Sequence, residues 1–268
     1  MTSRPNPLHI AITGASGGLG RALSEHYARP GRRLSLAGRD HRRLMDCVQA
    51  CRSRGALVVA DRFDIRETSA LGAWLGEADR AQPLDLVFAN AGVSASAAES
   101  GLEQPRDLER LLEVNALGAA RTALAAAELM TERGRGQIAI MGSLASLYPL
   151  KSCPAYCAGK AAARLYGLSL RAGLAPFGVG VTVVSPGYVD TPMSRRLKGS
   201  KPLLWDAERA AAFIAGRLKA NPPEIVFPKI LALGLAFLSC LPEPAAGFFS
   251  RGFSGFMVEP DEESSSRL

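Results

Sequence analysis

The sequence predicts one α/β domain built on a mostly parallel, doubly wound sheet of seven strands with helices on both faces. Its length of 268 residues suits a single large domain of this class. Short apolar runs alternate along the chain with longer segments of helical pattern, and a glycine-rich turn follows the first apolar run. This alternation is typical of parallel strands joined by right-handed crossover helices.

The expected strands are continuous apolar runs, as in parallel strands that are covered on both faces. They are residues 8–13, 33–37, 56–60, 84–89, 137–142, 179–185 and 224–227. The expected helices lie between them, at residues 18–28, 41–54, 67–79, 105–133, 155–175 and 206–220. In such a Rossmann-type sheet, ligands bind at the carboxyl ends of the strands, near the point where the strand order reverses.

The domain is expected to cover residues 1–258, and the acidic, serine-rich tail at 259–268 is expected to be disordered. Its last part, 228–258, is a variable apolar segment. Residues 230–241 are uncharged and mostly apolar, but they are fewer than the about 20 residues that span a membrane. We interpret them first as a helix that covers the substrate cleft or forms a subunit contact. The alternative is a peripheral membrane contact through 230–256, by shallow insertion.

Composition excludes several classes of protein. A hydrophobic content of 47% with 21% charged residues argues against disorder. The net charge of +7 is equalled by the surplus of twelve arginines over five acidic residues in residues 1–66. One interpretation is that these arginines are solvated on the surface. The other is that some of this positive charge faces a phosphate group. Nucleic acid is not an expected partner, because no basic stripe interleaved with aromatic residues is visible.

The five cysteines give little functional information. Their spacing lacks the paired motifs of a zinc site, so we expect free thiols in a reducing compartment and no metal. The N-terminus shows no signal-peptide pattern, and the expected location is therefore the cytoplasm. The alternative is a cytoplasmic protein bound peripherally to the inner face of a membrane.

The glycine-rich turn between residues 14 and 20 is the first functional candidate. Its glycines permit a tight turn, a close approach of backbone to a pyrophosphate, and close packing of helix on strand. The following helix N-terminus offers free N–H groups to an anion. The cofactor contacts expected from this turn are Gly14, Ser16, Gly18, Leu19 and Gly20.

The end of the second strand predicts which cofactor the turn holds. A chain that selects NAD(H) usually has an acidic residue here for the ribose 2′-hydroxyl, but this chain has Gly38 and then Arg39. A guanidinium suits a 2′-phosphate, so we expect NADP(H) rather than NAD(H). A surface arginine at a helix start is the alternative, and Asp40 could cap that helix.

Tyr156 and Lys160 are one helical turn apart and therefore project from one helix face. A free phenol has a pKa of about 10, and a nearby cation lowers that value. With the ammonium and an oxidised nicotinamide close by, Tyr156 is expected to be acidic enough to exchange a proton with a substrate oxygen near neutral pH.

Two further residues strengthen this interpretation. Ser143 follows the strand at 137–142, where its hydroxyl could hold the same substrate oxygen. Asn115 falls inside a predicted helix, where asparagine is a mediocre helix former. That position invites a role such as ordering a water next to Lys160, against the alternative of a partly exposed helical asparagine.

These motifs together resemble the short-chain dehydrogenase/reductase superfamily. The matching elements run in family order from Thr13-Gly14-x-x-x-Gly18-x-Gly20 through Asp64, Asn90-Ala91-Gly92, Asn115, Ser143, Tyr156-x-x-x-Lys160 and Pro186-Gly187 to Thr191. The resemblance implies a catalytic set of Ser143, Tyr156 and Lys160, with Asn115 supporting a proton relay. It also implies that Lys160 binds the ribose hydroxyls of the cofactor.

The resemblance implies further cofactor contacts along the strand ends. Asp64 and Ile65 are expected near the adenine, and Asn90, Ala91 and Gly92 along the cofactor. Pro186, Gly187, Val189 and Thr191 are expected near the nicotinamide carboxamide. Ala89 departs from the asparagine frequent in the family, and no glycine-rich closing strand follows Phe227, which puts tetramer assembly in doubt and leaves a homodimer as the expected state.

The expected function is carbonyl–alcohol interconversion by an NADP(H)-dependent oxidoreductase of this superfamily. The residues expected to line the cleft at 94–98 and 144–150 are small or apolar, which favours a largely apolar small molecule or a lipid-like substrate. The loop at 188–204 carries Arg195, Arg196, Lys198 and Lys201, which either meet an anionic substrate or are solvated. The alternative function is a non-catalytic NADP(H)-binding regulatory protein.

Overall fold

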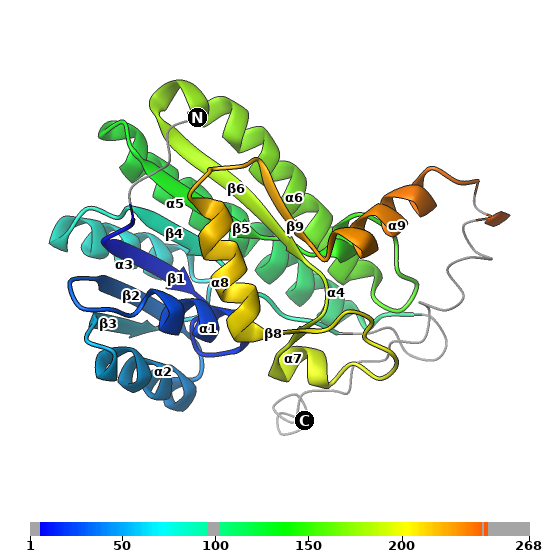
Figure 1. Cartoon of the computed structure of the whole chain (residues 1–268), viewed down its shortest axis with the longest axis horizontal. Helices are drawn as coiled ribbons and strands as arrows, with labels where there is room; N and C mark the ends of the chain where they lie inside the picture. Colours follow the sequence, from blue (N-terminus) through cyan, green and yellow to red (C-terminus); the bar gives the residue numbers. More distant parts are fainter. Residues whose placement is uncertain (1–5, 96–101, 243, 246–268) are drawn as a thin grey trace.

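The computed structural model describes residues 6–95, 102–242 and 244–245. A sheet of seven strands forms its centre, in the order β3-β2-β1-β4-β5-β6-β9, and all neighbouring strands are parallel (Figure 1). The strands are β1 (His9–Thr13), β2 (Arg33–Gly38), β3 (Leu57–Arg62), β4 (Leu86–Ala89), β5 (Gly136–Met141), β6 (Val179–Pro186) and β9 (Glu224–Phe227). The predicted doubly wound fold is confirmed, and the strand order reverses between β1 and β4.

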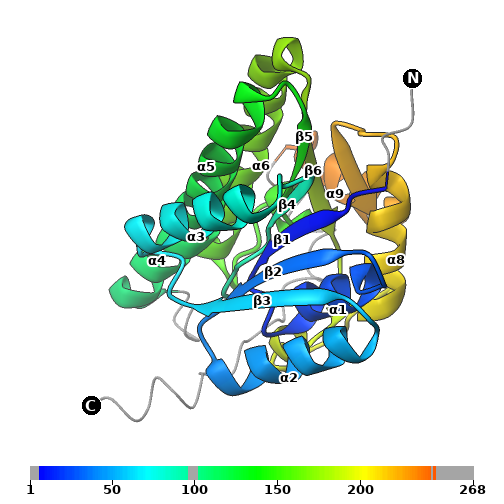
Figure 2. The ribbon, with the colours of Figure 1, turned by 90° about the vertical axis from the view of Figure 1, so that its left-hand side faces the viewer.

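Helices cover both faces of the sheet (Figure 2). One face carries α1 (Gly18–Tyr27), α2 (His41–Ser53) and α8 (Ala207–Leu218). The other carries α3 (Thr68–Ala81), α5 (Ala119–Glu132) and α6 (Pro154–Leu174). Successive strand residues explain the two layers, because Ile10 and Ile12 pack into the first core and Ala11 into the second.

The predicted helix at 105–133 is interrupted. It divides into α4 (Pro105–Leu112), a π-helical turn η1 (Glu113–Gly118) and α5. Helical periodicity does not distinguish a π turn from an α turn, so the sequence pattern missed it. Asn115, a mediocre helix former, lies inside this turn and is fully buried. Turns of this type occur often at functional sites.

Short elements complete the carboxyl edge of the sheet. They are η2 (Leu144–Ser146), η3 (Ala175–Phe177), α7 (Pro192–Arg195) and a two-stranded sheet of β7 (Val189–Asp190) and β8 (Trp205–Asp206). The sequence pattern predicted none of them, because elements of two to four residues carry no clear periodicity.

The apolar segment after β9 forms α9 (Lys229–Ser239), which extends away from the sheet (Figure 1). Within the described ranges, no helix is both long enough and apolar enough to cross a bilayer. The predicted tail at 259–268 and most of the segment 228–258 beyond α9 lie outside the described residues.

Candidate active site

The glycine turn follows β1 at the point where the strand order reverses. Gly14 and Gly18 have φ angles of +67° and +53°, in the left-handed region that favours glycine. A Cβ added to Gly20 would collide with the Gly14 carbonyl oxygen, so helix α1 can approach the turn only with glycine there. The geometry fits the pyrophosphate of a dinucleotide, because the N-terminus of α1 follows a turn rich in glycine, where backbone can approach an anion closely.

Asn90 stabilises the glycine turn by hydrogen bonds to its backbone. Its Nδ2 donates to the backbone oxygens of Thr13 and Gly14, at 2.9 and 3.2 Å. The Thr13 hydroxyl in turn accepts from the backbone N–H groups of Asn90 and Ala91, at 3.0 and 3.2 Å. Thr13 was not among the predicted site residues. Its place as the first residue of the motif was the available signal, but a strand-end threonine by itself is unremarkable.

The segment after β6 reaches the turn from the other side. Thr191 caps α7 through a capping box, and its side chain lies about 3.2 Å from where a Gly18 Cβ would stand. The Gly187 N–H donates to the Phe227 carbonyl oxygen at 2.7 Å, directly after Pro186. The Val189 side chain is buried in the core, so this predicted cofactor contact offers only its backbone.

The predicted cofactor contacts Ser16, Leu19 and Ile65 differ in what their side chains contact. Ser16 faces the end of β2, with its Oγ 2.8 Å from where a Gly38 Cβ would stand. Leu19 is partly buried and packs against the first core. Ile65 is buried in the second core and touches the Gly118 position of the π turn. Leu19 and Ile65 thus present mainly backbone to a ligand.

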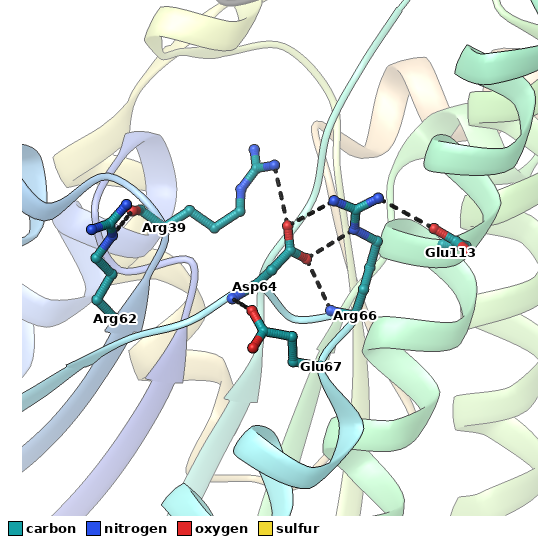
Figure 3. A network of polar contacts seen from close by, with 6 residues as sticks. All are labelled: Arg39, Arg62, Asp64, Arg66, Glu67 and Glu113. Carbon is teal, nitrogen blue, oxygen red and sulfur yellow. Dashed lines mark hydrogen bonds and ion pairs between the residues drawn. The ribbon is translucent and has the colours of Figure 1, made fainter.

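Arg39 lies in a charged network at the ends of β2 and β3 (Figure 3). Its Nη1 is 3.6 Å from an Asp64 carboxylate oxygen, whereas Arg66 contacts both oxygens of that carboxylate at 3.0 Å. Burial raises the pKa of Asp64, but hydrogen bonds from Arg66 and the charge of Arg39 lower the pKa overall. The charge of Asp64 is thus neutralised mainly by Arg66. The Arg39 side chain is 51% exposed.

Asp40 also occupies the role expected of it. Its carboxylate accepts from the Arg43 N–H at 2.9 Å and caps α2. It is therefore engaged at the start of the helix, which leaves Arg39 as the charged side chain at the end of β2.

Ser143 and Tyr156 come together at the carboxyl end of β5. The Ser143 side chain lies near the Tyr156 phenol, and its hydroxyl oxygen accepts from the Ala145 N–H at 3.1 Å. Burial raises the pKa of Tyr156 to about 12, and the Ser143 contact opposes this rise. The Lys160 ammonium lies 5.9 Å from the ring centroid, and desolvation prevails in the protein alone; the expected lowering involves an oxidised nicotinamide as well and stays a prediction. At neutral pH Tyr156 is a phenol that can donate its proton.

Lys160 points from the same face of α6 into the interior. Its side chain is only 5% exposed, and its ammonium donates to the Met141 carbonyl oxygen at 2.9 Å. Burial lowers the pKa of Lys160 to about 8. The charge state of Lys160 therefore changes close to physiological pH.

Asn115 braces the loop after β4. Its Oδ1 accepts from the Val93 N–H at 3.0 Å, and its Nδ2 donates to the Val93 carbonyl oxygen at 2.9 Å. A Cβ added to Gly92 would stand 3.1 Å from this Oδ1 and 3.3 Å from the Lys160 Nζ. Asn115 and Lys160 therefore face one small space beside Gly92, which supports the predicted water position without testing it.

Gly159 was missed as a site residue. Its Cβ position would lie 3.1 Å from the Asn115 Cβ and 3.3 Å from the Leu111 carbonyl oxygen. A small residue here lets α6 pack closely on the π turn and brings Lys160 to Asn115. Its position next to Lys160 in the sequence was the only signal.

The loop after β5, which is expected to line the cleft, contacts helix α9. The Ser239 hydroxyl donates to the Leu147 carbonyl oxygen at 2.6 Å, which fixes the end of α9 to the loop after β5. This contact supports the interpretation of α9 as a helix beside the cleft. Of the expected lining at 94–98, residues 96–98 lie outside the described part of the chain.

The basic loop after β6 is partly engaged. Arg195 pairs with Asp190 through two contacts of 2.7 and 3.0 Å, and its side chain is 69% exposed. This pairing favours solvated loop charge over a cation aimed at a substrate. Among the described residues, no group of three or more histidine, cysteine, aspartate or glutamate side chains is arranged to hold a metal ion.

The sheet order and the glycine turn place the chain in the class of Rossmann-type α/β proteins. A family model described as short chain dehydrogenase matches residues 8–201, and the chain belongs to this family of oxidoreductases. The predicted resemblance is confirmed.

Curated relatives agree with this assignment. A protein of Myxococcus xanthus (strain DK1622) described as "Uncharacterized oxidoreductase" is 32% identical over 234 residues, covering 87% of this chain and 92% of the relative. The 1-deoxy-11-beta-hydroxypentalenate dehydrogenase of Streptomyces exfoliatus is 32% identical over 212 residues, 76% of each chain. The probable oxidoreductase EphD of Mycobacterium tuberculosis (strain ATCC 25618 / H37Rv) is 32% identical over 186 residues, but these are 31% of its length and 68% of this chain.

Solved structures show the same fold. A short-chain dehydrogenase from Sphingobium yanoikuyae in complex with NADPH has a TM-score of 0.73 at 22% identity, covering 88% of this chain and 96% of that one. A short chain dehydrogenase/reductase from Burkholderia phymatum in complex with NAD has a TM-score of 0.76 at 25% identity, covering 84% and 90%.

Proposed function

We propose that this protein is an NADP(H)-dependent oxidoreductase that interconverts a carbonyl and a secondary or primary alcohol, with Tyr156 as general acid and base. The single observation that carries the proposal is the placement of the Tyr156 phenol near Ser143 and over a buried Lys160, whose Nζ lies 5.9 Å from the ring centroid. A binding protein needs no such proton donor.

The glycine turn and the Tyr156 cluster are continuous in space. The Ala91 Cα lies 2.8 Å from where a Gly14 Cβ would stand, and the adjacent Gly92 position lies 3.3 Å from the Lys160 Nζ. A ligand that extends from the turn along residues 90–92 therefore reaches Lys160. This path supports a dinucleotide cofactor, and the comparison structures named above bind NADPH or NAD.

In this proposal the bound nicotinamide supplies or accepts the hydride. Ser143 holds the substrate oxygen, and Tyr156 donates a proton to that oxygen during reduction. Lys160 binds the cofactor ribose and supplies a positive charge near the phenol. Asn115 holds a relay water beside Lys160. Reduction suits the raised pKa of Tyr156, because the phenol is protonated at neutral pH.

The preference for NADP(H) rests on Arg39. Its guanidinium is half exposed and loosely held by Asp64, and Ser16 faces the same strand end. A 2′-phosphate placed there meets a positive charge and a hydroxyl without an unpaired carboxylate, since Arg66 neutralises Asp64.

The proposed substrate is a largely apolar or lipid-like small molecule. Ile230, Leu233 and Phe237 are 70%, 71% and 61% exposed on α9, which contacts the loop after β5. The same stripe supports the predicted peripheral membrane contact. That contact and the homodimer stay predictions, which vesicle flotation and light scattering of the purified chain can check.

A panel of carbonyl compounds, followed by NADPH absorbance, tests the function. Tyr156→Phe should lower kcat by about 100-fold or more, the range of general acid catalysis. NADPH fluorescence should show unchanged cofactor binding in this variant. Equal slow rates in both proteins would favour the alternative, a non-catalytic NADP(H)-binding regulatory protein.

A further inference from the structure

Two thiols bracket the candidate tyrosine. Cys153 is the N-cap residue of α6 and Cys157 lies one turn later, with Tyr156 between them in sequence. Their Sγ atoms are 4.0 Å apart and hydrogen-bonded to each other. The proposed chemistry of carbonyl reduction uses neither thiol.

The backbone explains why these sulfurs meet. Cys153 has a non-helical conformation, with φ −153° and ψ 60°, and makes no side-chain cap of its own helix. The carboxylate of Glu103 takes over that capping and accepts from the Ala155 N–H at 3.0 Å through both oxygens. The Cys153 side chain is thereby left to contact Cys157 and the Ser152 hydroxyl.

The chain contains a second pair with the same spacing, which differs in access. Cys47 and Cys51 lie inside α2, and both are fully buried at 0% exposure. Cys153 is partly exposed, and Cys157 is 8% exposed. The α6 pair is therefore the more accessible of these two pairs to a small oxidant in solvent.

The environment of the α6 pair supports reactivity. The α6 N-terminus favours negative charge at its first turn. The hydrogen bond from Cys153 lowers the pKa of Cys157, while burial and the charge of Glu103 oppose this effect. The same hydrogen bond and burial raise the pKa of Cys153, so Cys157 is the thiol expected to attack first, and Cys153 lies 4.0 Å away to complete the reaction.

We propose that Cys153 and Cys157 form an oxidation site for hydroperoxides, which closes to a disulfide and displaces Tyr156 from Ser143. One thiolate attacks a peroxide oxygen and breaks the O–O bond, which yields a sulfenic acid and, with hydrogen peroxide, water. The second thiol then displaces water from the sulfenic sulfur and forms the S–S bond. In total, two thiols and one hydrogen peroxide give one disulfide and two waters.

We expect bond formation to move the first turn of α6. A disulfide is about 2.05 Å long, so the two sulfurs must approach by about 2 Å. Tyr156 is on the same turn, so a shift of this turn changes how the phenol lies relative to Ser143. The consequence for catalysis rests on the proposed function, whereas formation of the disulfide does not.

The test treats the full-length protein with hydrogen peroxide and measures three quantities. Peptide mass spectrometry after alkylation should show a Cys153–Cys157 linkage and free Cys47 and Cys51. Hydrogen exchange should increase in the peptide covering residues 153–160. NADPH-dependent carbonyl reduction should fall by about tenfold or more, and dithiothreitol should restore it.

Matched variants separate the two pairs. Cys153→Ser and Cys157→Ser should keep the basal rate and resist peroxide, whereas Cys47→Ser and Cys51→Ser should stay sensitive. The proposal is overturned if the linkage does not form, if residues 153–160 exchange unchanged, or if Cys153→Ser is inactivated like the wild type. If the untreated protein reduces no carbonyl compound, the proposed function fails. Mass spectrometry of the Cys153–Cys157 linkage and hydrogen exchange of residues 153–160 still test the oxidation site.

Discussion

The ammonium of Lys160 donates to the backbone carbonyl oxygen of Met141 at 2.9 Å, which joins helix α6 to the last residue of strand β5. This bond holds a cation in an interior position where its side chain is 5% exposed. The position is suited to a cofactor ribose and to the nearby phenol, and burial lowers the Lys160 pKa to about 8.

The Lys160 pKa predicts how stability depends on pH. In the unfolded chain lysine titrates at about 10.4, so between about pH 8 and pH 10 the unfolded state binds more protons than the folded state. The free energy of unfolding of the wild type should therefore rise with pH in this window relative to Lys160→Met, by at most about 3 kcal/mol. Urea denaturation of both proteins between pH 7.5 and 10 measures this, and parallel curves would contradict it.

Gly20 should tolerate no side chain. Its added Cβ would collide with the Gly14 carbonyl oxygen, so Gly20→Ala should weaken NADPH binding by about tenfold or more and lower the free energy of unfolding by about 1–3 kcal/mol. Gly17→Ala is the matched control, because no atom lies within 4 Å of its Cβ position and its φ is −162°. Fluorescence titration with NADPH compares them, and equal binding would remove the steric argument.

Arg39 should set the choice of cofactor. Arg39→Ala should raise the Kd for NADPH by about 10- to 100-fold through loss of one charged phosphate contact, and leave the Kd for NADH nearly unchanged. Arg43→Ala removes a nearby arginine that pairs with Asp40 at 3.3 Å and should change neither constant. Calorimetric titration at fixed ionic strength gives both values. An equal loss for the two cofactors in Arg39→Ala would show that Arg39 does not recognise the 2′-phosphate.

Glu224 should anchor α6 to the edge of the sheet. Arg164 contacts both of its oxygens at 2.8 Å, and the Ser185 hydroxyl donates to one of them at 2.8 Å. Glu224→Gln should lower the free energy of unfolding by about 1–3 kcal/mol, because a bidentate, partly buried pair is lost.

Glu25→Gln serves as the comparison for that substitution. It breaks pairs with Arg21 and Arg54, whose side chains are 47% and 52% exposed. Its effect should be below about 1 kcal/mol, as for other solvent-exposed pairs. Chemical denaturation of both variants measures the difference, and equal effects would show that the Glu224 network does not anchor α6.

Much of the site could be predicted because each residue is tied to a strand end or to one helix. The turn from Gly14 to Gly20, Ser143 after β5, and Tyr156 with Lys160 on α6 all lie where periodicity and topology placed them. The clamp between Thr13 and Asn90 could not be predicted, because it joins residues far apart in the chain and each is ordinary in its own segment. Elements of two to four residues were missed for lack of a measurable period.

The amino-acid pattern by itself determined the parallel sheet, the order of its motifs and the identity of the chemical groups, because these follow from local periodicity and residue type. Only the tertiary structure decided their electrostatic state. The Tyr156 pKa rises to about 12 and the Lys160 pKa falls to about 8 because elements distant in sequence bury Lys160 and partly bury Tyr156. The π turn at Asn115, against which α6 packs, and the capping of α6 by Glu103, which leaves Cys153 to contact Cys157, likewise appear only in the tertiary structure.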